Sequence, residues 1–150
     1  MKTVSKITVI LLALLMMLTL VACNAPEAEG PEAEGPEAEG AWATAIHLTD
    51  KTFGDGAKTV TVVVKAEERS QTFTLKTDKE FLGEALEEHD LIEGKEGAYG
   101  IFVTAVNGIT VSDADRTYWA LYKDGAYSMT GVDTTPIADG DSFELVKEGY

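Results

Sequence analysis

Three identical copies of the five-residue unit PEAEG, at residues 26–40, separate the parts of this chain that can fold from those that cannot. Each unit contains a proline and a glycine, which stop a helix from propagating, and no apolar side chain larger than alanine. The six glutamates of this segment repel one another and favour an extended chain. We therefore expect 24–40 to be a spacer, with a recognised acidic ligand motif as the alternative. The folded part is then 41–150, long enough for one modest core.

An almost unbroken apolar stretch covers residues 7–21, after the basic residues Lys2 and Lys6. Its fifteen residues are fewer than the roughly 20 that a helix needs to span a bilayer. A basic start followed by a short apolar segment is typical of an export signal rather than a permanent membrane span.

The only cysteine of the chain, Cys23, follows this stretch in the sequence Leu-Val-Ala-Cys at 20–23. This sequence resembles the bacterial lipobox, in which the thiol is linked to diacylglycerol before cleavage on its N-terminal side. The resemblance implies a lipoprotein signal peptide at 1–22, a lipidated Cys23 with its linker at 23–40, and a domain at 41–150. Several acyl chains would hold the protein stably on the extracytoplasmic face of the cell membrane. An ordinary signal peptide or an uncleaved anchor with a coincidental cysteine is the alternative.

The charge of the folded part excludes one class of partner. Residues 41–150 contain 20 acidic and 10 basic side chains, a net charge of −10. Nucleic acids and anionic headgroups are bound through Lys and Arg, so this domain is expected to bind no nucleic acid. The single cysteine also excludes an intramolecular disulfide and a zinc site built on several thiolates.

Alternating apolar residues predict strands in the first half of the domain. In 59–65, Val60, Val62 and Val64 share one face, and in 71–77 Phe73 and Leu75 do so. These two strands are expected to form a hairpin through 66–70. A weaker pattern favours a first strand at 42–48.

One helix is expected after the hairpin. Thr77 and Glu80 have the spacing of a capping box, and Phe81, Leu82, Ala85 and Leu86 follow as an apolar stripe. The opposite side of this helix is glutamate-rich, so the helix should lie across a sheet with one face buried.

Further strands follow the helix. The sequence favours strands at 99–106 and 109–111 around Asn107-Gly108, at 117–123 before Asp124-Gly125, and at 142–147. No βαβ alternation is present. The pattern therefore predicts an α+β fold, a mainly antiparallel sheet with one packed helix.

Catalytic and metal-binding patterns are scarce. His47 has no recognisable partner, and His89 continues the apolar stripe at the expected end of the helix. No nucleophile, zinc or phosphate-loop motif occurs. The aspartate pairs at 113–115 and 139–141 do not continue into calcium-loop spacing, and turn aspartates that bond their own backbone explain them. We expect no enzyme activity, no metal and no obligatory cofactor.

Aromatic residues are concentrated in thirty residues of the second half. Alternation in 117–123 places Tyr118 and Tyr122 on one face and Trp119 on the other. These rings can fill a small core and its rim, or they can form a stacking surface for a ligand.

The segments that carry these rings resemble a known family. FLGEALEEHDLIEG (81–94), YWALYKDG (118–125), TGVDTTPI (130–137) and DGDSFEL (139–145) are similar to the transcobalamin C-terminal-like domain, over roughly 59–147. The resemblance implies a β-grasp-like sheet with one helix. In vertebrate carriers this domain covers one side of cobalamin.

This family resemblance gives the functional hypothesis. It implies a noncatalytic binding module whose ligand is corrinoid-like or another small molecule. The ligand-binding residues that it suggests are Tyr99, Tyr118, Tyr122, Tyr127 and Thr130. The alternative is a cell-surface module that binds a protein or a wall polymer without a small-molecule ligand.

Overall fold

The computed structural model describes residues 38–98 and 100–150. The predictions on the signal peptide at 1–22, on Cys23, on most of the linker and on Tyr99 lie outside these residues. In the described part of the chain, no helix is both long and apolar enough to cross a membrane.

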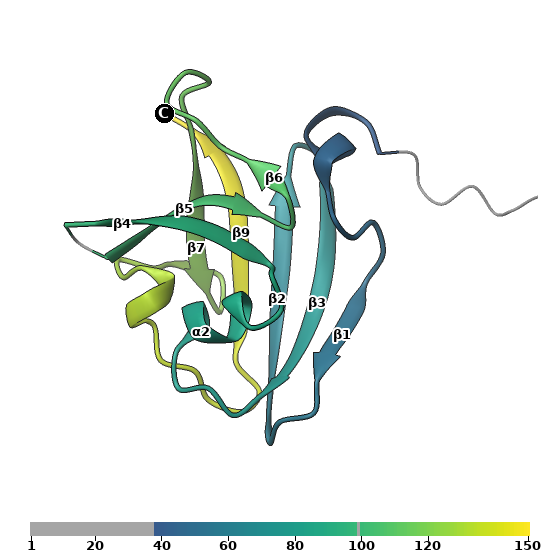
Figure 1. Ribbon diagram of the computed structural model, residues 1–150, viewed down its shortest axis with the longest axis vertical. Helices are drawn as coiled ribbons and strands as arrows, with labels where there is room; N and C mark the ends of the chain where they lie inside the picture. The colour runs from purple at the N-terminus through teal and green to yellow at the C-terminus, as the bar shows by residue number, and fades with distance from the viewer. Residues whose placement is uncertain (1–37, 99) are drawn as a thin grey trace, which may run out of the picture. The chain divides into compact units, whose positions relative to one another are not determined.

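Six strands form the main sheet, in the order β1-β3-β2-β9-β7-β8 (Figure 1). Their bounds are β1 (Lys51–Gly54), β2 (Lys58–Ala66), β3 (Arg69–Thr77), β7 (Thr117–Lys123), β8 (Ala126–Tyr127) and β9 (Ser142–Gly149). The pairs β2–β3, β7–β9 and β7–β8 are antiparallel, whereas β1–β3 and β2–β9 are parallel. The main sheet is therefore mixed, although most of its pairings are antiparallel.

A second layer covers one face of the main sheet. It consists of the helix α2 (Leu82–Glu87) and a small antiparallel sheet in the order β4-β5-β6. The strands of this sheet are β4 (Ile92–Gly97), β5 (Gly100–Val106) and β6 (Ile109–Thr110). Figure 1 shows both in front of the main sheet, and the hydrophobic core lies between the two layers. The described chain is thus mostly β with one α-helix.

The predicted alternation of the first hairpin is confirmed. Val60, Val62 and Val64 of β2 are buried, as are Phe73 and Leu75 of β3. The register pairs Val62 with Phe73 and Val60 with Leu75, so the apolar residues of both strands face the same core. Their neighbours in sequence lie on the uncovered face of the sheet.

The predicted capping box is wrong. Thr77 belongs to β3, and its hydroxyl accepts a hydrogen bond from the Lys79 N–H at 3.1 Å. The chain then stays extended: Phe81 forms a bridge with Pro136, and the Leu82 N–H donates to the Thr135 carbonyl at 2.9 Å. This long-range pairing delays the start of the helix to Leu82.

The later start changes which residues the helix buries. Leu82, Ala85 and Leu86 lie in the core as predicted, but Phe81 is the N-cap residue and is 36% exposed. His89 follows the end of α2 and lies in a turn rather than in a last helical turn.

The predicted strand at 42–48 is also wrong. A 3-10 helix, η1 (Gly40–Thr44), begins this segment and places Trp42 in the core. The Trp42 Nε1–H donates to the Ala66 carbonyl at 3.0 Å, at the end of the β2–β3 hairpin. The backbone of His47 bonds the side-chain amide of Asn107 at 2.9 and 2.8 Å instead of a strand.

Two neighbouring substitutions in β3 test the sheet's two faces. We expect Leu75→Ala to lower the free energy of unfolding by about 2–5 kcal/mol, because it leaves a cavity in the core. Thr74→Ala, on the uncovered face, should change it by less than about 1 kcal/mol. Urea unfolding measures both. Equal losses for the two variants would contradict this assignment of faces.

Candidate functional site

An open groove of about 280 Å³ lies between β7, β5 and the loop that follows β8. The residues that line it are Ile101, Phe102, Val103, Tyr118, Trp119, Leu121, Tyr127, Ser128, Met129, Thr130, Gly131, Val132 and Leu145. None of these residues is charged. The groove is therefore suited to apolar or uncharged polar groups.

Side chains from both faces of β7 line the groove, Trp119 and Leu121 from one face and Tyr118 from the other. Trp119 and Leu121 are buried on the core side, whereas Tyr118 and Tyr122 are half-buried on the other side, as the alternation predicted. Trp119 is 8% exposed, and its Nε1–H has no hydrogen-bond acceptor among the described residues. The ring thus belongs to the core and also forms part of the groove wall.

Glu148 of β9 holds the two tyrosines of the uncovered face. The Tyr118 hydroxyl donates to Glu148 Oε2 at 2.9 Å, and the Tyr122 hydroxyl donates to Oε1 at 2.7 Å. The hydrogen bond to Glu148 is the main cause that raises the pKa of Tyr118 to about 12, and it also raises the pKa of Tyr122. Both hydroxyls therefore remain protonated at neutral pH and are occupied by an internal acceptor.

Three exposed apolar side chains surround the groove. Phe102 and Tyr127 are each 52% exposed and Met129 is 92% exposed. Tyr127 also contacts the Tyr122 ring edge-to-face, with centroids 5.5 Å apart. Half of the six large exposed hydrophobic residues of the described chain are thus gathered at this one site. Such gathering marks a binding surface more often than scattered exposure does.

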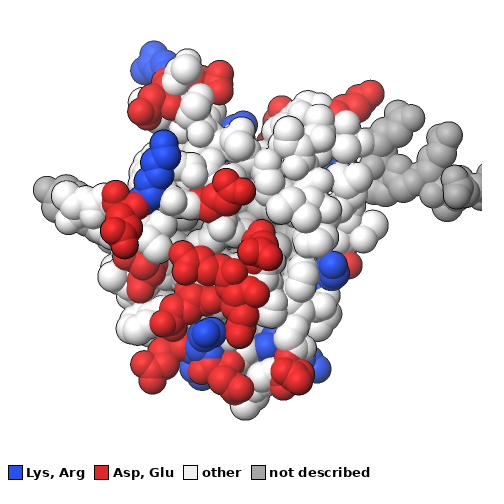
Figure 2. Space-filling model, viewed as in Figure 1, with Lys and Arg blue, Asp and Glu red and all other residues white. Residues whose placement is uncertain are grey.

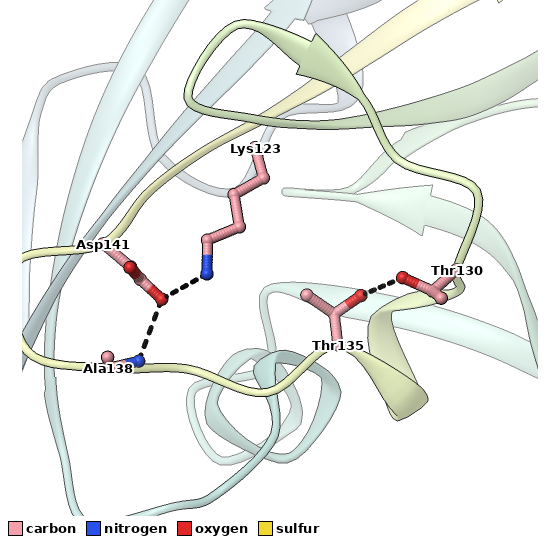
Figure 3. Close-up of polar contacts among 5 residues, drawn as sticks. All are labelled: Lys123, Thr130, Thr135, Ala138 and Asp141. Atoms are coloured by element: carbon pink, nitrogen blue, oxygen red, sulfur yellow. Dashed lines mark hydrogen bonds and ion pairs between the residues drawn. The ribbon is translucent and has the colours of Figure 1, made fainter.

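Hydrogen bonds within the chain fix the loop after β8. The hydroxyls of Thr130 and Thr135 are 2.9 Å apart (Figure 3), and the Thr135 hydroxyl also lies 2.7 Å from the Gly131 carbonyl. The Ser128 hydroxyl accepts from the Thr130 N–H at 3.3 Å. These bonds turn the loop back on itself, so that it forms one wall of the groove.

Asp133 connects this loop to β5. It lies in the short 3-10 helix η2 (Val132–Thr134), and its Oδ2 accepts from the Ile101 N–H at 3.3 Å. A Cβ atom at Gly100 or at Gly131 would collide with this carboxylate. Glycine is required at both positions for Asp133 to approach the backbone of β5.

The structure places the predicted ligand-binding residues as follows. Tyr118, Tyr127 and Thr130 line the groove, and Tyr122 lies beside it through its contact with Tyr127. Tyr99 lies outside the described residues. Whether these side chains bind a ligand stays a prediction.

Phe102 and Met129 line the groove but were not among the predicted ligand-binding residues. Phe102 precedes the buried Val103 in β5, so strand alternation could have marked it as exposed. Met129 is a large apolar residue in a polar loop, which is a weaker signal.

The predicted bonding of turn aspartates to the backbone is confirmed at Asp141 but not at Asp115, which bonds a side chain. Asp141 Oδ2 accepts from the Ala138 N–H at 2.9 Å and from Lys123 Nζ at 2.8 Å (Figure 3). Burial tends to raise the pKa of Asp141, but these hydrogen bonds outweigh it and hold the pKa below its usual value. Asp115 accepts from the Ser112 hydroxyl at 2.6 Å. In the described part of the chain, no three histidine, aspartate or glutamate side chains converge as a metal site.

The two histidines lie together, away from the groove. The His47 and His89 rings are 5.3 and 5.1 Å from the ring of Phe53. Burial, and then the charge of Lys51, lower the pKa of His47. Neither histidine is among the groove-lining residues, so the site contains no imidazole base.

Acidic side chains gather on the face of the molecule that carries α2 (Figure 2). Glu84 and Glu87 on the exposed side of the helix contribute to this charge. The uncharged lining of the groove contrasts with the acidic domain around it.

These features define a class of protein: a small, mostly β domain with an open, uncharged groove and no catalytic constellation among the described residues. Residues 80–145 match the family described as a domain of unknown function, DUF4430. The chain is also 37% identical to a solved candidate metal-binding protein from Ruminococcus gnavus ATCC 29149, at a TM-score of 0.60. That match covers 62% of this chain and 98% of the relative. The chain therefore belongs to the DUF4430 family, and the family-level resemblance predicted from its sequence is confirmed.

A second solved structure, haptocorrin in complex with Cbi, is 23% identical at a TM-score of 0.49. That match covers 65% of this chain but 27% of haptocorrin. No curated protein matches the chain. Neither the family nor the Ruminococcus relative is described as an enzyme, in agreement with the noncatalytic prediction.

The tyrosine pair on Glu148 can be tested by titration. We expect Glu148→Gln to lower the pKa of Tyr118 from about 12 toward its ordinary 10.0, because the charged acceptor is lost. Ultraviolet absorbance of tyrosinate over a pH series measures the shift. Because the folded-state pKa of Tyr118 is raised, the stability from this hydrogen bond is complete below pH 10 and is lost as pH rises toward 12.

The control variant is Glu144→Gln, since Glu144 bonds Lys65 and neither tyrosine hydroxyl. It should leave the titration of Tyr118 unchanged. An unaltered Tyr118 pKa in the Glu148 variant would show that this carboxylate does not control it.

Proposed function

We propose that this protein is a noncatalytic, lipid-anchored binding module on the extracytoplasmic face of the cell membrane. The observation that carries the proposal is the uncharged groove beside β7, surrounded by three exposed apolar side chains in an otherwise acidic domain. Burial of an apolar ligand against such a surface is favourable. The surface offers no group that would carry out chemistry on the ligand.

Support for the anchor comes from the sequence. The basic residues Lys2 and Lys6, the apolar stretch at 7–21 and the only cysteine, Cys23, follow one another in the order of a lipoprotein signal. The acidic repeats up to residue 40 would then hold the domain away from the membrane. A net charge of −10 in 41–150 agrees with this, since anionic headgroups repel the domain.

The strand order supports a β-grasp-like assignment of the main sheet. The β2–β3 hairpin leads to α2, and the last strand, β9, returns to pair in parallel with β2. β7 then pairs antiparallel with β9. The family resemblance implied a β-grasp-like sheet with one helix, and the hairpin, the helix and the parallel pairing of β2 with β9 support that assignment.

The groove favours a ligand that it covers on one side. Its volume of about 280 Å³ lies below the roughly 300–1,000 Å³ of sites that enclose drug-sized ligands. A corrinoid-like molecule is the first candidate, because the segments at 118–125 and 130–137 resemble the transcobalamin C-terminal-like domain. Metal binding, the property by which the Ruminococcus relative is described, gains no support here, since no group of three donor side chains lies in the described residues.

A second candidate function is a surface module that binds a protein or a wall polymer without a small-molecule ligand. The exposure of Met129, at 92%, favours it, because a side chain so exposed contributes little to enclosing a small molecule. Measured affinity for a free small ligand distinguishes the two functions.

Mass spectrometry of the membrane-extracted protein tests the anchor. We expect the mature chain to begin at Cys23 and to carry diacylglycerol with additional acyl chains such as palmitate. Cys23→Ser should abolish the added mass. If the signal is still cleaved in this variant, the protein should also be released from the membrane. An unmodified N-terminus at any other residue would falsify the anchor.

Titration calorimetry with cobalamin and cobinamide tests the ligand. A fragment of residues 38–150 suits this test, because the relative, which matches 62% of this chain over 98% of its own length, folds without a longer N-terminal segment. We expect binding that weakens about tenfold or more in Tyr127→Ala, which removes an aromatic wall of the groove. Tyr150→Ala removes a tyrosine that is 60% exposed, against 52% for Tyr127, and that does not line the groove, so this variant should bind as the wild type does. Absence of heat at millimolar ligand would exclude corrinoids.

A further inference from the structure

One edge of β7 is only partly covered by its neighbour. In an antiparallel strand, successive residues direct their N–H and C=O groups to opposite sides. The Arg116 carbonyl and the Asp124 N–H bond β9 residues or their neighbours, which places the even-numbered positions of β7 on the β9 side. Thr117 and Leu121 bond Ser112 and Ser128 on the other side. Trp119 therefore directs both of its backbone groups to the edge away from β9.

Strand β8 does not reach Trp119. It pairs Tyr127 with Tyr122, and the Ser128 N–H then donates to the Leu121 carbonyl at 2.8 Å. Beyond this bond, the described residues provide no backbone partner for the Trp119 N–H, the Trp119 C=O or the Leu121 N–H. Three hydrogen-bonding groups of this strand edge thus lack a backbone partner among the described residues, beside the groove that Trp119 and Leu121 line.

The loop after β8 explains why this edge stays uncovered. If the pairing continued in register, Thr130 would lie opposite Trp119. Instead, the Thr130 hydroxyl bonds that of Thr135 (Figure 3). The Thr130 N–H donates to the Ser128 hydroxyl. Asp133 holds the next part of the loop to β5. The chain itself is therefore held away from the place that a further strand would occupy.

Residues 118–122 of β7 contain none of the features that usually protect an open edge. Proteins usually protect open edges with lysine, proline, a bulge or a covering segment. Residues 118–122 are Tyr-Trp-Ala-Leu-Tyr, without a charge or a proline, and β7 pairs with β9 without a bulge. The exposed side chains of Phe102 and Met129 stand beside the edge, where they can contact side chains of an added strand.

We propose that the groove binds an extended peptide segment, which adds as a strand to β7 by exchanging backbone hydrogen bonds with Trp119. This inference rests on the proposed binding function and names the ligand class of the same site. One residue of the peptide pairs with Trp119, its neighbours place uncharged or apolar side chains against Phe102 and Met129, and the rest of the peptide continues beyond the groove. Backbone bonds supply affinity in this mode and side-chain contacts supply selectivity.

The size and charge of the site favour a peptide of another protein over a second copy of this chain. A groove of about 280 Å³ is too small to enclose a large ligand but suffices for a short stretch of an extended one that continues outside it. Two copies would bring together domains of net charge −10 each, which opposes edge-to-edge pairing. The uncharged lining in an acidic domain indicates a segment with an uncharged centre and neutral or basic flanks.

Selection from a phage-displayed library of random linear decapeptides, against the full chain in detergent micelles, identifies peptide probes. We expect recovered peptides to have an uncharged, β-branched or aromatic centre. Phe102→Lys should weaken their binding about tenfold or more, because it puts a charge against the apolar centre. Ile46→Lys is the matched control, since Ile46 is 56% exposed and lies outside the groove, and it should bind normally.

Hydrogen exchange of single amides tests the geometry. In the free protein, the amides of Trp119 and Leu121 should exchange faster than those of Tyr118, Ala120 and Tyr122, which face β9. A bound peptide should slow exchange at Trp119 and Leu121. N-methylation of the peptide at the residue opposite Trp119 should weaken binding about tenfold, and N-methylation of the next residue far less.

Three results would overturn the peptide proposal. These are a library that yields no binder, binders that tolerate every N-methylation, and protection of the Trp119 amide that rises with protein concentration alone. The last result would indicate a second copy at this edge. A corrinoid that binds while these peptide tests fail would leave the proposed function standing and remove only the peptide. Peptide binding without corrinoid binding would support the peptide proposal and remove the corrinoid as a ligand.

Discussion

The parallel pairing of β2 with β9 is the interaction on which the rest of this domain depends. It joins segments about eighty residues apart, with Val62 beside Phe143 and Val64 beside Leu145, all of them buried. The pairing completes the core beneath α2, and it also provides the strand against which β7 forms. Without β9, neither the Trp119 wall of the groove nor the tyrosine pair on Glu148 would have a fixed position.

The groove exists because the chain that follows β8 stops pairing with β7 although the register would allow the pairing to continue. Four neighbouring contacts cause this departure: Ser128 with Thr130, Thr130 with Thr135, Thr135 with Gly131, and Asp133 with Ile101. Each is a hydrogen bond within the loop or to β5, so together they replace the ladder bonds that β7 would otherwise offer. Glycines at 100 and 131 give the Asp133 carboxylate the space that this arrangement needs.

The sequence predicted what depends on local pattern. Strand alternation identified the buried faces of β2, β3 and β7, and the Asn107-Gly108 and Asp124-Gly125 turns were located correctly. The sequence-based prediction was wrong where distant partners decide the local structure. Phe81 stays extended because Pro136 pairs with it, and the indole Nε1–H of Trp42 is held by the Ala66 carbonyl. The site followed the same rule. Of the residues predicted to bind a ligand, Tyr118, Tyr127 and Thr130 line the groove, whereas the positions of Phe102 and Met129 depend on how β5 and the loop meet.

Under the proposed binding function, the charge of the domain and the contacts in the groove would act on a ligand at different distances. A domain of net charge −10 repels anionic partners at a distance of about one Debye length, near 8 Å at physiological salt. Within the groove no charged side chain is present, so burial of apolar surface and backbone hydrogen bonding decide which ligand stays. The approach of a ligand would thus depend on the net charge of the domain, and its retention on the lining of the groove. An acidic ligand would be repelled by the net charge of the domain before it contacted the groove. A basic but purely polar ligand would be attracted, but it would bury no apolar surface in the groove.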